Sequence, residues 1–262
     1  MIPINTNIIA VANQKGGVGK TTTVVNLATA MAACDKKVLI IDSDPQGNAS
    51  TGLGLEKKNI KNNFYDVIRG DISINKSIIN TQIPNLFIIP TSMDLAAIEQ
   101  EFVNVEKREE QLKKEIENLN IVFDYILIDC PPSLGLLTLN ALVACKNLLV
   151  PLQVEFYALE GLTQLMKTVN QIKNNYNNLL TLQGIVLTMY DKRNKISELV
   201  ACDVKNFFKE KVYKTIIPRN VKISEAPSHG MPILMYDISC SGSQAYASLA
   251  AEIINQENKL NG

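Results

Sequence analysis

The sequence predicts an α/β protein with a doubly wound, mostly parallel β-sheet and helices on both faces. Short runs of apolar, often β-branched residues alternate with longer segments of helical periodicity. Most of these runs are apolar at every position, which is typical of parallel strands covered on both sides. The helical segments between them are long enough for parallel crossover connections. No internal repeat, low-complexity tract or Pro/Gly/Ser linker interrupts the 262 residues, so we expect residues 1–262 to form a single domain.

Each expected strand is a short apolar run, and several end in a glycine-rich, acidic or proline-containing turn. In chain order the strands are residues 8–12, 38–41, 86–89, 125–128, 147–152, 184–188 and 215–217. The expected helices between and after them are residues 20–33, 93–119, 134–144, 159–176, 196–209 and 242–256. Within the second of these, residues 99–117 carry four basic and seven acidic side chains, a mixture that indicates a solvated helix face.

Composition excludes several classes of protein. Lys plus Arg equals Asp plus Glu at 26 each, so net charge gives no overall attraction to nucleic acid. The single histidine, His229, excludes zinc sites with two histidines and makes a histidine-based triad unfavourable. The five cysteines include no Cys-x-x-Cys pair, which argues against a disulfide framework, a structural zinc site or an iron–sulfur cluster. With no secretory signal and no apolar run of about 20 residues, a cytoplasmic protein is expected.

The segment after the first strand has the features of a phosphate-binding loop. Gly19-Lys20-Thr21 supplies the second half of that motif, whereas Gln14 stands where the motif has its first glycine. Glycines let backbone N–H groups converge on phosphate oxygens at the positive end of the next helix. Lys20 would bridge the β- and γ-phosphates, and the Thr21 hydroxyl would ligate Mg²⁺. The alternative, a glycine-rich turn with an incidental lysine, does not explain why strand, loop and helix are in register. The expected nucleotide-binding residues here are Lys15, Gly16, Gly17, Val18, Gly19, Lys20, Thr21 and Thr22.

Two further strands end in carboxylates that suit a metal ion. Asp129 follows four apolar residues, where a buried carboxylate needs a cation or a hydrogen-bond donor. Asp42 and Asp44 follow the second strand, at the edge where open α/β sheets bind ligands. A turn-and-cap cluster is the alternative explanation for that pair. The expected metal ligands on these grounds are Thr21 and Asp129, and the pair Asp42 and Asp44 offers a further carboxylate.

These motifs together resemble the deviant Walker group of P-loop NTPases, and within it the ParA/Soj-type chromosome-partitioning ATPases. The resemblance spans nearly the whole chain, with the motifs in the family's order. It rests on residues 15–22 (KGGVGKTT), 42–46 (DSDPQ), 128–133 (IDCPPS), 187–191 (LTMYD), 217–221 (IPRNV) and 224–230 (SEAPSHG).

The resemblance implies a catalytic set of Lys15, Lys20 and Asp44. Lys15 is similar to the family's signature lysine, which reaches the partner's phosphates across an ATP-sandwich homodimer and acts like an arginine finger. The rival interpretation is an exposed loop lysine. Asp44 resembles the residue that positions the attacking water. The resemblance places Asp42 nearer the metal, which completes an expected ligand set of Thr21, Asp42 and Asp129. Because no histidine base is available, we expect slow hydrolysis. The adenine-side residues would be Pro218, Arg219 and Asn220.

A local excess of positive charge underlies the expectation of DNA binding. Residues 192–222 contain nine basic and three acidic residues, a net charge of +6. In Soj-like proteins, basic residues of these loops form a sequence-independent surface for double-stranded DNA, which neutralises phosphates and is salt-dependent. The candidates are Arg193, Lys195, Arg219 and Lys222. A solvated helix face is the competing explanation, mainly for Lys205, Lys209 and Lys211.

The expected function is therefore an ATP- and Mg²⁺-dependent chromosome- or plasmid-partitioning ATPase. By resemblance, its ATP-bound homodimer would bind nucleoid DNA non-specifically and leave it when a ParB/Spo0J-like partner stimulates hydrolysis. The alternative is a MinD-like membrane-associated positioning ATPase, which needs a basic amphipathic C-terminal helix. Residues 245–262 contain one lysine, so no membrane partner is expected. A cluster-carrying relative would need paired cysteines.

Overall fold

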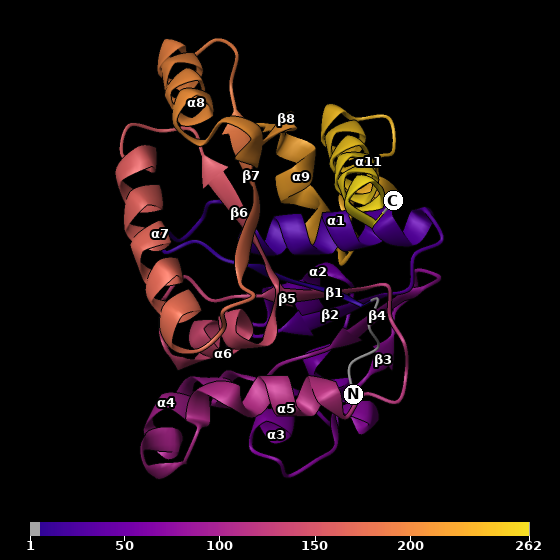
Figure 1. The fold of residues 1–262 in the computed structure, drawn as a ribbon. Helices are drawn as coiled ribbons and strands as arrows, with labels where there is room; N and C mark the ends of the chain where they lie inside the picture. Colours follow the sequence, from indigo (N-terminus) through magenta and orange to yellow (C-terminus); the bar gives the residue numbers. More distant parts are fainter. Residues whose placement is uncertain (1–5, 262) are drawn as a thin grey trace.

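The computed structural model describes residues 6–261, which form one eight-stranded sheet covered by helices (Figure 1). The strand order is β3-β4-β2-β5-β1-β6-β7-β8. Every pairing is parallel except that of β3 with β4, at one edge. The strands are β1 (Asn7–Val11), β2 (Val38–Asp42), β3 (Ile79–Asn80), β4 (Leu86–Ile89), β5 (Tyr125–Asp129), β6 (Asn147–Gln153), β7 (Thr181–Tyr190) and β8 (Val212–Pro218).

The centre of the sheet is buried on both faces, as the apolar runs predict. All five residues of β2 and all five of β5 are buried. The chain passes from β1 to β2 on one side of β1, and later from β5 to β6 on the other side. The strand order therefore reverses beside β1, which creates a crevice at the carboxyl ends of β1 and its neighbours.

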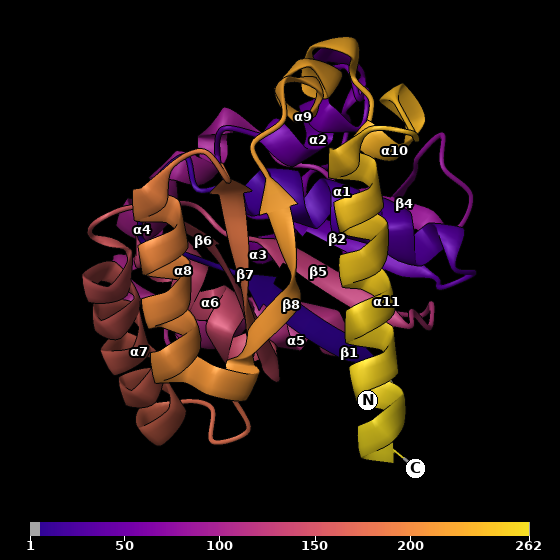
Figure 2. The ribbon, with the colours of Figure 1, turned by 90° about the horizontal axis from the view of Figure 1, so that it is seen from above.

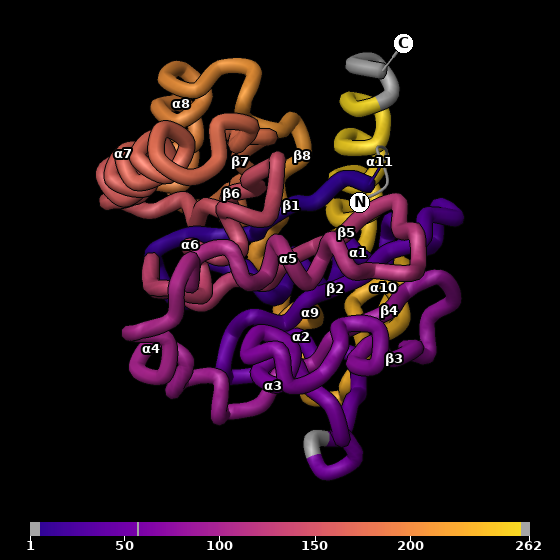
Figure 3. The backbone as a smooth tube through the Cα atoms, turned by 60° about the horizontal axis from the view of Figure 1, so that its bottom comes forward, coloured from indigo at the N-terminus to yellow at the C-terminus, as the bar shows by residue number. Residues whose placement is uncertain are grey.

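Helices form a layer on each side of the sheet. One layer, above the strands in Figure 1, holds α1 and α11, which pack on the same apolar core as α2 and α10. The opposite layer contains α5 and α6, which lie in front of the sheet in Figure 3, with α7 and α8 beside β6 and β7 in Figure 2. The helices are α1 (Lys20–Ala33), α2 (Asn48–Gly52), α3 (Phe64–Ile68), α4 (Ile98–Glu101), α5 (Gln111–Glu117), α6 (Leu136–Ala144), α7 (Ala158–Asn175), α8 (Lys195–Phe208), α9 (Val221–Glu225), α10 (Ile233–Tyr236) and α11 (Ser241–Asn261).

The prediction of one helix over residues 93–119 is wrong. The segment consists of short 3₁₀ and α turns, interrupted at Val105, which is extended, and at Lys107, whose φ is +51°. Between Phe102 and Leu112 no side chain is buried. Without an apolar stripe facing the core, charged residues alone do not hold a continuous helix there.

A close contact of two turns joins α2 to the segment after α9. Gly54, with φ +77°, and Gly230, with φ +63°, meet backbone to backbone. A Cβ at Gly54 would lie 2.9 Å from the carbonyl oxygen of Gly230. The left-handed backbone and the lack of space both require glycine at these two positions.

Polar side chains cluster where the strands begin, opposite the crevice. The half-buried carboxylate of Glu257 on α11 accepts hydrogen bonds from Asn7, Tyr125 and Gln183. Gln183 is the extra residue of a β-bulge in β7. Next to it, Gly184 has no side chain, which leaves room for the ring of Tyr213. In the described part of the chain, no helix has the length and apolar character needed to cross a membrane.

Candidate nucleotide site

The loop between β1 and α1 has the backbone of a phosphate cradle. Gly17 and Gly19 have φ values of +75° and +89°, which other residues rarely adopt. The helix α1 begins at Lys20 without a side-chain cap. Its first N–H groups are therefore available for an anion, at the positive end of the helix dipole.

Two side chains outside the predicted set hold this loop on the sheet. Asn13 donates to the carbonyl of Pro151 on β6 at 2.8 Å and accepts from the backbone N–H of Lys15 at 3.1 Å. The Thr188 hydroxyl on β7 donates to the carbonyl of Val18 at 2.9 Å. Both residues are buried. Sequence reasoning missed them because a single Asn or Thr at the end of a strand gives no distinctive pattern.

The two lysines of the loop occupy opposite environments. The side chain of Lys20 is buried, and its amine donates to the carbonyl of Lys15 at 3.0 Å, inside the loop. Burial lowers the pKa of Lys20, an effect that the carboxylate of Asp129 partly offsets. The side chain of Lys15 is 52% exposed and forms an ion pair with Glu155, which lies just after the end of β6. The two amines therefore do not converge on one point.

Two buried carboxylates face each other on neighbouring strands. Asp42 and Asp129 are paired in the β2–β5 register, and both are fully buried. Burial and the charge of Asp42 raise the pKa of Asp129 well above its usual value, and the nearby Thr21 hydroxyl acts in the opposite direction. Burial also raises the pKa of Asp42 to about 6, while hydrogen bonds from Ser50 lower it.

The oxygens of this pair fit a divalent cation. Asp42 Oδ1 and both oxygens of Asp129 are buried without a hydrogen-bond partner among the described residues. Unpaired buried carboxylate oxygens are costly unless a cation meets them. No group of three or more His, Cys, Asp or Glu residues in the described part of the chain could hold a metal ion by itself. Mg²⁺ is commonly held by one or two carboxylates together with phosphate oxygens, which agrees with this arrangement.

Asp44 lies in a tight turn that leads into α2. Its Oδ1 accepts the backbone N–H of Gln46 at 3.0 Å, and its carbonyl accepts that of Gly47 at 2.8 Å. Asp44 therefore caps a turn, as the alternative explanation of the Asp42 and Asp44 pair predicted. The residue is also buried beside Lys20 and Asp129, so the turn holds its carboxylate at the site.

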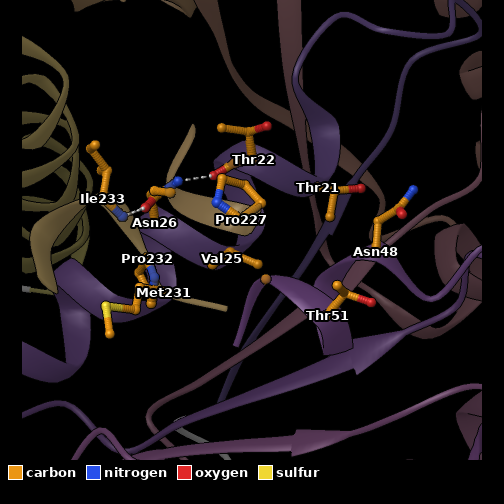
Figure 4. Close-up of a pocket in the computed structure, with 12 residues that line it drawn as sticks. Thr21, Thr22, Val25, Asn26, Asn48, Thr51, Pro227, Met231, Pro232 and Ile233 are labelled. Atoms are coloured by element: carbon orange, nitrogen blue, oxygen red, sulfur yellow. Dashed lines mark hydrogen bonds between the residues drawn. The ribbon is translucent and has the colours of Figure 1, made fainter. Parts of the chain in front are cut away.

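A cavity of about 270 Å³ lies beside the loop, between α1, α2 and the segment after α9 (Figure 4). Asn26 is one of the lining residues, and it donates to the carbonyl of Thr22 at 2.8 Å and accepts from Ile233 N–H at 2.7 Å. Thr21 and Thr22 line the cavity, whereas the predicted adenine-side residues 218–220 do not. Pro218 ends β8, where it pairs with Tyr190 at the end of β7, and residues 219 and 220 follow it.

The four predicted DNA-binding cations lie in the two segments that follow the neighbouring strands β7 and β8, Arg193 and Arg219 in the loops and Lys195 and Lys222 on the first turns of α8 and α9. Arg193 binds Asp191 through two side-chain hydrogen bonds of 3.0 and 2.8 Å, which lower the pKa of Asp191 to about 2. Lys222 forms an ion pair with Asp237. Arg219 is exposed and has no salt-bridge partner among the described residues, and Lys195 begins α8. Of the other five basic residues, Lys192 lies in the loop after β7, whereas those at 205, 209, 211 and 214 lie toward the opposite end of α8 or at the start of β8.

A parallel sheet with a glycine-rich loop at its reversal point, a buried loop lysine and two strand-end carboxylates defines a P-loop nucleoside triphosphatase. A family described as an AAA domain matches residues 6–182. The chain is 51% identical over 252 residues to the chromosome partitioning protein ParA of Caulobacter vibrioides, covering 95% of this chain and 94% of that protein. It is 49% identical over 246 residues to the sporulation initiation inhibitor protein Soj of Bacillus subtilis, with coverage of 94% and 97%.

This chain belongs to the ParA/Soj family of chromosome-partitioning ATPases. A solved structure named cobyrinic acid a,c-diamide synthase, from Mycobacterium smegmatis, was determined with an ATP analogue and magnesium. It matches with a TM-score of 0.84 and 33% identity, over 97% of this chain and 96% of that one. The predictions of family, fold class, ATPase activity, and ATP with Mg²⁺ as cofactors are confirmed.

Proposed function

We propose that this ATPase is a nucleotide-gated DNA switch for chromosome or plasmid partitioning. Two copies would clasp ATP between them, bind double-stranded DNA without sequence preference, and leave the DNA when ATP is hydrolysed. The observation that carries the proposal is the divergence of the two loop lysines. The amine of Lys20 stays inside the phosphate loop, whereas that of Lys15 extends outward to Glu155.

The position of Lys15 supports a role at a second copy's nucleotide. A side chain that leaves its own loop can reach a phosphate presented from outside, where a cation stabilises the charge that develops in phosphoryl transfer. Next to its partner Glu155, Phe156 and Tyr157 are 76% and 69% exposed and pack edge to face. Exposed aromatic side chains are typical of surfaces that become buried in association.

In the proposed hydrolysis, different residues of the site would bind the phosphates, bind Mg²⁺ and position the attacking water. Lys20 and the loop amides would hold the phosphates, while Thr21, Asp42 and Asp129 would hold Mg²⁺, which supplies Lewis-acid polarisation of the phosphoryl group. Asp44 would orient the attacking water. Because burial and turn geometry fix Asp44, its contribution is positioning, and hydrolysis would stay slow until a ParB/Spo0J-like partner binds.

Arg219 supports the assignment of the DNA surface. It is an exposed cation directly after the carboxyl end of β8, as the phosphate loop follows the carboxyl end of β1, and these strands point the same way in the sheet. Arg193 and Lys222 carry carboxylate partners, which DNA phosphates would have to displace. A dimer doubles this surface, so avidity alone would make DNA binding depend on nucleotide. The protein would accordingly be cytoplasmic and associated with the nucleoid.

The structure favours DNA over a membrane as the surface that is bound. In α11 the apolar side chains of Tyr246, Leu249 and Ile253 are buried against the protein's own core. A MinD-like switch needs a C-terminal helix whose apolar face is free for lipid. Over residues 241–257, where the side chains of α11 are described, its apolar face packs against the protein's own core, which argues against that alternative.

The test combines subunit size with DNA retention. Asp44→Ala should be dimeric with ATP and monomeric with ADP by light scattering, and its ATP form should stay on random duplex DNA. Adding Arg219→Glu should abolish DNA retention while the ATP dimer persists. Lys205→Glu, the same kind of charge reversal at the far end of α8, is the matched control and should keep DNA binding. A monomeric Asp44→Ala protein at saturating ATP and Mg²⁺ would refute the proposed switch.

A further inference from the structure

Ser50 on α2 makes a contact that the sequence motifs do not assign. Its side chain is fully buried. The hydroxyl donates to Oδ2 of Asp42 at 2.8 Å, and the backbone N–H of the same residue donates to that oxygen at 3.0 Å. Both donors therefore occupy one carboxylate oxygen, and Oδ1 of Asp42 has no partner among the described residues.

We propose that Ser50 is a positioning residue for the magnesium site. By fixing Oδ2 of Asp42, it would determine that Oδ1 is the oxygen presented to the cation. The inference rests on the proposed role of Asp42 as a metal ligand. Residues that hydrogen-bond a ligating carboxylate orient it, and removing such an outer partner commonly lowers metal affinity by about 10–100-fold.

The helix α2 is itself held firmly, so Ser50 can act as a fixed reference. Ala49 and Leu53 are buried in the core, and Gly52 lies close to Val25 of α1. Asn48 and Thr51 lie on another side of the helix, where they line the cavity of Figure 4. The position of Ser50 is thus set by packing rather than by its bond to Asp42.

The same contact closes a short loop around Asp44. Asp42 and Ser50 are eight residues apart in sequence, and the turn that begins at Asp44 lies between them. Fixing both ends of this loop restricts its conformational freedom. Ser50 would therefore restrict the motion of both the proposed metal ligand, Asp42, and the proposed water-positioning residue, Asp44.

The test measures magnesium dependence of nucleotide binding, not turnover. A fluorescent ATP analogue is titrated into the full chain at a series of Mg²⁺ concentrations and in EDTA. Ser50→Ala should raise the half-saturating Mg²⁺ concentration about tenfold, with affinity in EDTA unchanged. Ser77→Ala is the matched control, because Ser77 is also fully buried and its hydroxyl has no partner among the described residues.

Ser50→Cys separates the hydrogen bond from the filled volume, since a thiol occupies the same place but donates weakly. A folded Ser50→Cys protein should retain most of the magnesium shift. Wild-type magnesium dependence in this variant, or a shift in Ser50→Ala no larger than in Ser77→Ala, would overturn the inference.

Asp42→Asn tests whether Ser50 acts through Asp42. In that background Ser50→Ala should add little to the magnesium requirement, because position 42 then offers the cation no carboxylate for Ser50 to orient, and effects that act through one ligand are not additive. A full additional tenfold effect would overturn the inference. If Asp42→Asn itself leaves magnesium dependence unchanged, the failure lies instead in the proposed metal ligand.

Discussion

In the metal-free protein, Asp42→Asn should increase stability at neutral and alkaline pH. Asp42 is fully buried beside Asp129, and burial raises its pKa from 3.8 to about 6. A change of that size corresponds to about 3 kcal/mol of lost stability once the carboxylate is ionised. The asparagine oxygen can still accept both hydrogen bonds from Ser50, while the repulsion with Asp129 disappears.

The sign of the pH dependence follows from the raised pKa. Between the unfolded and folded pKa values, the native state holds a proton that the unfolded state has released, so wild-type stability falls as pH rises through this window. The Asp42→Asn variant has no ionisable group at this position, so this pH-dependent loss of stability is absent from it. Its advantage over wild type should therefore be about 1 kcal/mol near pH 4.5 and about 3 kcal/mol near pH 8.

Urea unfolding in EDTA, followed by circular dichroism, measures this difference. For a chain of this size, 3 kcal/mol corresponds to a rise of roughly 6–12 °C in Tm. Asp203→Asn, at an exposed position on α8, is the control and should leave stability unchanged at both pH values. Equal stability of wild type and Asp42→Asn near pH 8, or an advantage that does not grow with pH, would refute the reasoning.

Three further changes test other parts of the molecule. Glu257→Ala leaves three side-chain donors without their acceptor and should cost about 2–4 kcal/mol, seen as an earlier urea midpoint; an unchanged midpoint would contradict the proposed network. Gly184→Ala would place a Cβ 2.4 Å from the ring of Tyr213 and should cost about 1–3 kcal/mol, so calorimetry should show a lower Tm rather than an equal one. Asp191→Asn removes the negative charge and one of the two side-chain acceptors that hold Arg193 and should strengthen binding to random duplex DNA, with a salt dependence steeper by about one phosphate contact. Filter binding over a salt series measures that slope, and a slope equal to wild type would exclude competition by Asp191.

The elements with strong apolar periodicity could be predicted from sequence. Every expected strand is present, and the helix expected at residues 20–33 has those bounds. The short pieces could not be predicted: β3 has two residues and α2 has five, so neither shows a period. In the segment from 93 to 119 the density of mixed charges predicts a solvated helix face, but a helix with a solvated face also needs an apolar face opposite it.

The residues of the candidate site that could be predicted are those whose charge is unusual for their position in the sequence. Lys20 and Asp129 are recognisable because a buried charge at the end of an apolar strand or at the start of a helix needs a ligand. Ser50 and Asn13 could not be found this way, because their importance lies in which atoms they meet after folding. Asp191 and Asp237 were missed for the same reason: the sequence shows an excess of cations but not their carboxylate partners.

The contact between the turns at Gly54 and Gly230 bears on how the nucleotide site is mechanically coupled to the predicted DNA-binding segment at α9. Side chains usually separate neighbouring segments and can change rotamer when one segment moves, but here the two backbones are in direct contact. One turn belongs to the helix anchored at the carboxylate of Asp42, and the other follows the helix that carries Lys222. A shift of α2 toward a bound cation would therefore either move the turn at Gly230 with it or open a gap between the two turns, because no side chain lies between them to adjust.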